Sequence, residues 1–328
     1  MRRLEEDRQL GSSTDELDKG DGRMKILVTG SRGAVGTHLV AELEGRGHEV
    51  WETDRGHFHQ GLYRRSDIGE FRQLESVIDA AEPELVYHLA GEFGRRNGED
   101  FYETMWKANA IGTKNLLTLQ RRSGFRSILF SSSEVYGDHD GVMIEDVLER
   151  VPIRQLNDYA ISKWVNELQA MNATDEWGAE IVRVRLFNTY GPGEYFSEYR
   201  SAICKFIYKA MTVQPLEIYT NHRRTSTYVT DTCRTLANIA DNFKAGVVYN
   251  IGGEELHDMK SVNDMILGYM DVDDSHVTYK ESEPMTTKDK IVDCSKARAD
   301  LRHDPQITLE VGIPKTVDWM RSVYQAAR

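Results

Sequence analysis

The sequence predicts an α/β fold built on a doubly wound parallel sheet. From residue 24 onward, short apolar segments that suit buried parallel strands alternate with segments of helical period. The first apolar segment also runs into a glycine-rich turn that opens a helix. Repeated strand-then-helix units of this kind imply right-handed crossovers between parallel strands.

Composition narrows the class of protein. The chain has 328 residues, 40% of them hydrophobic, and a formal charge of −12, which argues against a main role in gripping nucleic acid or an anionic membrane. Its three cysteines are too few and too scattered for a disulfide framework or a zinc site. Without an apolar membrane span or a secretory signal, a cytoplasmic enzyme or binding protein is expected. Residues 1–23 are charged and poor in large apolar side chains, which predicts a flexible leader.

The turn after the first predicted strand, residues 25–29, carries glycines at 30, 33 and 36. Gly30 permits the tight turn, Gly33 lets the backbone approach a pyrophosphate, and Gly36 lets the helix pack close to the sheet. The helix start then offers unpaired N–H groups to phosphates. This spacing, in this context, indicates a dinucleotide site.

A second predicted strand, residues 48–53, ends at Asp54. A carboxylate about 20 residues beyond the glycine turn suits a ribose 2′-hydroxyl and favours NAD over NADP. Arg55, Arg64 and Arg65 lie nearby and keep a 2′-phosphate as the alternative.

The alternation continues through a helix over 71–81, a strand over 85–91 and a helix over 101–122. A polar stretch follows the strand and begins at Glu92. Its Arg95 and Arg96 are expected to contact an anionic ligand or to lie in a solvated loop. The next strand, 127–130, runs into the serine-rich segment 131–137. Ligands of such sheets bind beyond the carboxyl ends of the strands.

Tyr159 and Lys163 are spaced i and i+4 on a predicted helix, so they project from one face. A nearby ammonium favours the tyrosinate, so we expect Lys163 to lower the pKa of Tyr159 toward a working value. A serine hydroxyl from the preceding strand end completes a site for acting on a substrate hydroxyl.

Together these motifs resemble the extended short-chain dehydrogenase/reductase family, specifically its NAD-dependent nucleotide-sugar epimerases and dehydratases. The resemblance covers roughly residues 24–325. Further matching segments are Asp67-Ile68, His88-Leu89-Ala90-Gly91, Asn109, residues 131–137, residues 185–193 and residues 224–231. The sequence departs from the family at Gly91, where alanine is frequent, and at Ser226, where an aromatic residue is usual.

The resemblance implies a role for each matching residue. Tyr159 would be the base that takes the proton of a sugar hydroxyl, Lys163 would hold the nicotinamide ribose, and Ser132 would be the catalytic serine. Ser133 and Glu134 would complete the catalytic group. The implied cofactor contacts are Gly30, Arg32, Gly33, Ala34, Val35, Gly36, Asp54, Asp67, Ile68, Leu89, Ala90, Gly91, Asn109, Ser131, Tyr159, Lys163 and Phe187. The implied substrate contacts are Glu92, Arg95, Ser132, Ser133, Asn188 and Arg224, the last two at the diphosphate of a nucleotide sugar.

The reaction stays open at this stage. The leading prediction is an epimerase that acts through a transient 4-keto sugar. A 4,6-dehydratase or a UDP-glucuronate-type decarboxylase that uses Glu134 is the alternative, since the pair Ser133-Glu134 lacks the acid of glucose-type dehydratases and resembles GDP-mannose dehydratases and UDP-glucuronate decarboxylases. A non-catalytic NAD-binding regulator is a more remote alternative.

The predicted elements and the family resemblance also suggest the domain boundaries. Residues 24–190 are expected to form the NAD-binding domain, a Rossmann-type fold. Residues 191–328 mainly form a smaller, interleaved substrate domain, with the segment from about 228 to 255 returning to the first domain. The resemblance also implies a homodimer formed by the helices 101–122 and 158–172, with Met105, Trp106, Leu117 and Trp164 as candidates for the interface or the core. No residues have metal-ligand spacing.

Overall fold

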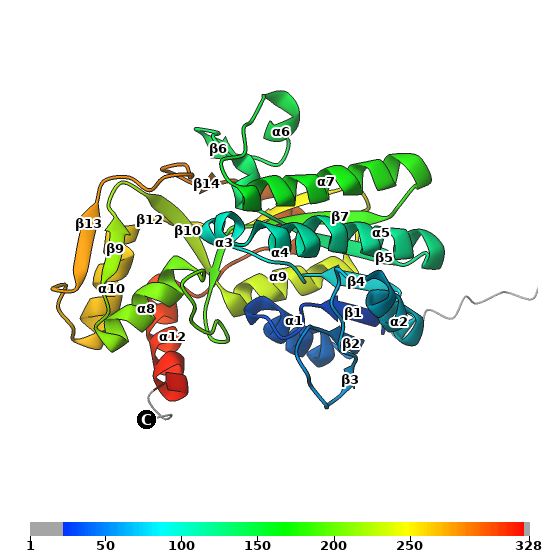
Figure 1. Ribbon diagram of the computed structural model, residues 1–328, viewed down its shortest axis with the longest axis horizontal. Helices are drawn as coiled ribbons and strands as arrows, with labels where there is room; N and C mark the ends of the chain where they lie inside the picture. Colours follow the sequence, from blue (N-terminus) through cyan, green and yellow to red (C-terminus); the bar gives the residue numbers. More distant parts are fainter. Residues whose placement is uncertain (1–21, 325–328) are drawn as a thin grey trace, which may run out of the picture.

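A seven-stranded parallel sheet forms the centre of the molecule (Figure 1), as the α/β prediction requires. The computed structural model describes residues 22–324, so the predicted leader 1–23 falls almost wholly outside the described residues. The strands run in the order β11-β7-β5-β4-β1-β2-β3. Their bounds are β1 Lys25–Thr29, β2 Glu49–Thr53, β3 Leu62–Tyr63, β4 Leu85–His88, β5 Arg126–Ser132, β7 Ile181–Leu186 and β11 Val248–Ile251.

Helices cover both faces of this sheet, which explains why its strands β1, β4 and β11 are almost wholly buried. Ile26 and Val28 of β1 pack in one core with α1, α9 and α11, whereas Leu27 between them packs in a second core with α2, α5 and α7. Successive side chains of a strand point to opposite faces, so β1 contributes to both layers. The helices are α1 Ala34–Gly45, α2 Phe71–Ala81, α5 Gly112–Ser123, α7 Asp158–Trp177, α9 Val229–Asp241 and α11 Ser295–Leu301.

A smaller lobe lies beside the sheet, on the left in Figure 1. Ile203, Ile207, Ile218, Ile266 and Val317 are buried in its own apolar core. Its elements are β8 Asn188–Tyr190, α8 Ala202–Thr212, β9 Leu216–Tyr219, β10 Arg223–Tyr228, β12 Leu256–Asp258, α10 Met259–Met270, β13 Val277–Lys280 and α12 Leu309–Tyr324. The chain is interleaved, because β11 leaves this lobe to pair with β7 in the main sheet.

The segment between β4 and β5 differs from the single helix expected over 101–122. It comprises α3 Arg95–Asp100, α4 Tyr102–Trp106, the π-helical turn η1 Lys107–Ile111, and α5. The remaining elements are η2 Ser133–Tyr136, β6 Val142–Met143, α6 Val147–Arg150 and β14 Ile291–Val292. A π turn inserts one extra residue per turn and often marks a functional position.

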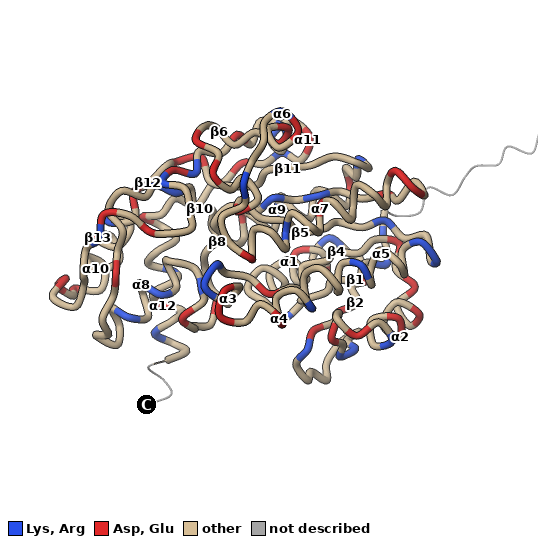
Figure 2. Tube along the Cα trace, turned by 45° about the horizontal axis from the view of Figure 1, so that its top comes forward, with Lys and Arg blue, Asp and Glu red and all other residues tan. Residues whose placement is uncertain are grey.

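Charges of both signs are interspersed along the described residues, as Figure 2 shows. No helix within residues 22–324 is long and apolar enough to cross a bilayer. The three cysteines are free and buried.

Candidate active site

A cavity of about 810 Å³ opens at the carboxyl ends of the central strands and continues beneath the smaller lobe. One end of it, the glycine end, is built around Gly30, Gly33 and Gly36. The other, the tyrosine end, is built around Ser132, Glu134 and Tyr159. The cavity therefore brings together the glycine turn and the Tyr-Lys pair, which are more than a hundred residues apart in sequence.

The glycine end depends on close approach of backbone atoms. Gly30 has a φ of 72°, and a Cβ there would lie 2.7 Å from the Ala90 nitrogen. A Cβ at Gly36 would lie 2.2 Å from the Gly30 carbonyl oxygen, which no side chain tolerates. The first turn of α1 therefore starts directly against the end of β1. Its N–H groups face the cavity without a side-chain cap.

Asp54 is fixed at the end of β2 by two backbone amides. Its carboxylate accepts the Arg32 N–H at 3.0 Å and the Arg55 N–H at 2.7 Å. The Arg32 side chain is held elsewhere, on Glu52 at 2.6 Å and over the Phe58 ring at 3.5 Å, and it does not line the cavity. Asp54 thus presents a fixed carboxylate to the cavity, whereas Arg32, a predicted cofactor contact, is not among the residues that line it.

Asn109 lies behind the cavity wall. It lies in the π turn η1, accepts the Glu92 N–H at 2.9 Å and donates to the Glu92 carbonyl oxygen at 3.0 Å. A Cβ at Gly91 would lie 2.7 Å from Asn109 Oδ1, so the unusual glycine makes room for this amide. Asn109 is not among the residues that line the cavity, whereas Asp67, Ile68, Leu89, Ala90, Gly91, Ser131 and Phe187 are. Ser226 does not line it either.

Tyr159 and Lys163 both line the tyrosine end, but their electrostatics differ from the expectation. Burial raises the pKa of Tyr159 to about 12, and its hydrogen bond with Ser132 opposes this only in part. Burial lowers the pKa of Lys163 to about 8. The Lys163 ammonium donates to the Phe130 carbonyl oxygen at 3.0 Å. The expected lowering of the Tyr159 pKa by Lys163 is therefore not seen, because desolvation dominates.

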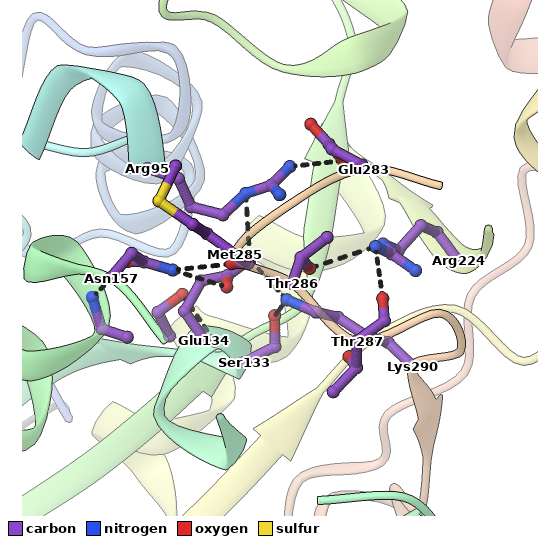
Figure 3. Close-up of polar contacts among 12 residues, drawn as sticks. Arg95, Ser133, Glu134, Asn157, Arg224, Glu283, Met285, Thr286, Thr287 and Lys290 are labelled. Atoms are coloured by element: carbon purple, nitrogen blue, oxygen red, sulfur yellow. Dashed lines mark hydrogen bonds and ion pairs between the residues drawn. The ribbon is translucent and has the colours of Figure 1, made fainter. Parts of the chain in front are cut away.

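Glu134 is the centre of a charged cluster (Figure 3). It forms an ion pair with the buried Lys290, whose ammonium also donates to Ser133 Oγ at 3.4 Å. The Arg95 Nε lies 3.8 Å from Glu134 Oε1, and Asn157 Nδ2 lies 3.5 Å from Oε2. Burial opposes ionisation of Glu134, but Lys290 and Arg95 outweigh it and lower the pKa of this carboxyl. Burial lowers the pKa of Lys290 to about 8. Glu134 is consequently ionised beside Ser132 and Tyr159.

Residues 281–290, which we name the strap, cross this end of the cavity (Figure 3). Arg224 holds the strap: its terminal nitrogens donate to the carbonyl oxygens of Thr287 at 2.9 Å and Lys288 at 2.6 Å, and to Thr286 Oγ1 at 3.2 Å. Arg224 lines the cavity, but its fork is engaged by the strap and is not open toward a diphosphate as expected. Asn188 and Glu92 also line the cavity, and Glu92 pairs with Arg55 at 2.9 Å.

Sequence reasoning missed Lys290, Glu283 and the strap. Lys290 lies in a charged stretch without any motif, and only the fold carries it 156 residues back to Glu134. A lone lysine in such a stretch gives no sequence signal.

Comparison with known proteins identifies the family. Residues 26–252 match the model of the NAD dependent epimerase/dehydratase family. The chain belongs to this family. UDP-glucuronic acid decarboxylase 1 of Arabidopsis thaliana is 31% identical over 328 residues, covering 95% of this chain and 74% of the relative. UDP-N-acetyl-alpha-D-glucosaminuronate decarboxylase of Bacillus cytotoxicus is 26% identical, over 92% of this chain and 99% of the relative. The solved structure of MoeE5 in complex with UDP-glucuronic acid and NAD superposes with a TM-score of 0.81 and 26% identity, over 91% of this chain and 99% of that one.

These findings make the protein an NAD-dependent enzyme of this family and not a non-catalytic regulator. The glycine end fits NAD, because its backbone leaves room that a Cβ would fill and Asp54 presents a fixed carboxylate. The relatives favour the decarboxylase alternative over the epimerase prediction.

Proposed function

We propose that the protein is an NAD-dependent decarboxylase of a nucleotide-linked sugar uronate. The observation that carries this proposal is the buried Glu134–Lys290 pair beside Tyr159 and Ser132. An epimerase needs one base and a hydride carrier. A second acid–base pair, with Glu134 on the cavity wall and Lys290 buried behind it, supports a reaction with a second proton transfer to carbon.

Oxidation at C4 of the sugar would begin the reaction. Tyr159 takes the hydroxyl proton while the C4–H bond breaks and the C4 ketone forms. Ser132 shares that hydroxyl and favours the tyrosinate, since its hydrogen bond lowers the Tyr159 pKa. When bound, NAD supplies the hydride acceptor, the later hydride donor and a positive ring charge that also favours the tyrosinate. Lys163 holds the ribose of that group.

Loss of carbon dioxide would follow from the 4-keto group. A uronate oxidised at C4 is a β-keto acid, so the C5–carboxylate bond breaks and its electron pair enters the ketone to give an enolate. The enolate needs a proton at C5. Glu134 lines the cavity and Lys290 lies directly behind it, so the carboxylate relays a proton from the ammonium to C5. Reduction of the ketone then returns the Tyr159 proton to the C4 oxygen.

The dehydratase alternative fits less well. Elimination of the 6-hydroxyl needs a carboxylic acid to protonate the leaving group. Ser133 stands at the position where glucose-type dehydratases carry that acid, and its hydroxyl accepts from Lys290. A serine hydroxyl is too weak an acid for this task.

We also propose a homodimer. Met105 and Leu117 are fully buried within the subunit, so they belong to its core and not to an interface. Ile161 and Leu168 of α7 are exposed and lie seven residues apart, on one face of the helix, and Ile111 of η1 is exposed as well. An apolar face of this kind suits a second copy of the same helices.

The test is product analysis with the full chain, NAD and UDP-glucuronate. We expect release of carbon dioxide and a UDP-linked pentose, detected by mass spectrometry and NMR. A product that keeps the carboxylate and differs only at one stereocentre would establish the epimerase instead. Tyr159→Phe, which retains the fold and the glycine end, serves as the inactive control.

A further inference from the structure

Arg95 lies at the tyrosine end of the cavity with a partner that belongs to the strap (Figure 3). Its Nη2 lies 2.9 Å from Glu283 Oε2, and its Nε lies 3.8 Å from Glu134 Oε1. Arg95 and Glu283 both line the cavity. Arg95 is the first residue of α3. Burial alone would lower the pKa of Arg95, but Glu134 and Glu283 raise it, so the group is a permanent cation.

We propose that Arg95 is the receptor for the carboxylate of the sugar and that Glu283 occupies it until a uronate arrives. The substrate carboxylate would take the place of the Glu283 carboxylate on the same guanidinium. A neutral hexose has no carboxylate that could displace Glu283, so Arg95 and Glu283 would stay paired. This inference rests on the proposed function for the identity of the substrate class, but it concerns binding and not turnover.

The other cations next to Glu134 and Tyr159 are committed elsewhere. The terminal nitrogens of Arg224 donate to the strap, and the Lys163 ammonium donates to the Phe130 carbonyl oxygen. Lys290 is buried behind Glu134 and does not line the cavity. Among the described residues, Arg95 is therefore the cation that both lines the cavity and lies within 4.0 Å of the carboxylate at its reacting end.

The side chains of the Arg95–Glu283 pair are partly exposed to solvent, as an ion pair that can exchange a partner requires. Its two side chains are 24% and 29% exposed, whereas those of the Arg185–Glu167 pair beneath the serines are 2% and 1% exposed. A partly solvated ion pair contributes little net free energy, so replacing one carboxylate by another costs little. A fully buried pair such as Arg185–Glu167 could not be opened in this way.

The strap itself need not open for this exchange. The Glu283 N–H donates to His222 Nε2 at 2.8 Å, and Arg224 and Asn157 hold the strap carbonyls further along. The backbone on both sides of the carboxylate is thus anchored. Exchange requires only a rotation of the Glu283 side chain, and Arg95 is paired with a carboxylate before and after it.

Binding measurements on the NAD-loaded protein test the proposal, with UDP-glucuronate and UDP-glucose as probes. Arg95→Gln should weaken UDP-glucuronate binding about tenfold or more, the loss of one charge-assisted contact, and leave UDP-glucose within about twofold. Glu283→Gln should strengthen UDP-glucuronate binding severalfold, because the competing charge is gone. Arg72→Gln, on the exposed surface of α2, controls for net charge.

Several results would overturn the proposal. They are an equal loss for both probes in Arg95→Gln, weaker uronate binding in Glu283→Gln, or no preference for UDP-glucuronate in the wild-type chain. Should Arg95→Gln fail to fold, as a thermal melt would reveal, the Glu283→Gln result decides alone. Product analysis stays separate: a chain that prefers uronate through Arg95 but releases no carbon dioxide refutes the proposed function and leaves this inference intact.

Discussion

The two ends of the cavity are built on different principles. At the glycine end, backbone atoms approach so closely that a single Cβ at Gly36 would meet the Gly30 oxygen at 2.2 Å. At the tyrosine end, charged side chains from α3, η2 and the strap neutralise one another around Glu134. The first end has no room for a Cβ at Gly30 or Gly36, and the second holds its charged side chains in ion pairs. On the proposed function, shape selects the dinucleotide, whereas charge selects the sugar and its reaction.

The largest expected effect is on turnover, at the tyrosine end. Tyr159→Phe removes the base and should lower kcat by about 10²- to 10⁴-fold. NAD affinity should stay within about twofold of wild type, because the glycine end is untouched. Steady-state kinetics and calorimetric titration of NAD check both halves of this prediction. Substantial loss of NAD binding would show that the two ends are not independent.

The converse change breaks the glycine end. Gly36→Ala forces its Cβ against backbone and should weaken NAD binding by about 10- to 100-fold. Gly45→Ala is the matched control in the same helix, since a Cβ there meets nothing within 4 Å. The control should bind NAD normally and melt at the same temperature or slightly higher. Normal NAD binding by Gly36→Ala would contradict the role given to backbone approach.

A smaller effect should follow from pH. Lys290 keeps its ammonium below about pH 8, since burial lowers its pKa to about 8. Raising the pH through 8 removes the proton that Glu134 relays, so kcat should fall severalfold on the alkaline side. Lys290→Met should have a low kcat without this alkaline limb, and Lys114→Met on the exposed face of α5 should match the wild type. An unchanged alkaline limb in Lys290→Met would assign the titration to another group.

The smallest effect on chemistry concerns assembly. Leu168→Asp places a charge on the exposed apolar face of α7 and should shift a dimer toward monomer in sedimentation experiments. Activity per subunit should change little, because both ends of the cavity lie within one chain. A dimer of unaltered stability would place the interface elsewhere.

The sequence predicted the main elements that build the glycine end. The prediction for β1, α2 over Phe71–Ala81 and the glycine turn matches the structure, because these features depend on local patterns and conformations. The sequence did not predict the π turn at Lys107–Ile111, because a helical period looks continuous across one inserted residue. The sequence did not predict the roles of the strap and Lys290, because these roles depend on contacts with residues more than a hundred positions away. Arg224 was found by motif, but its hydrogen bonds to the strap carbonyls were not.

The most direct test of the second proton transfer is a reaction of UDP-glucuronate in deuterium oxide. We predict carbon dioxide release together with one deuterium at C5 of the pentose, delivered through Glu134 and Lys290, and loss of both signals in Tyr159→Phe. A product that retains its carboxylate and carries no deuterium at C5 would contradict the account.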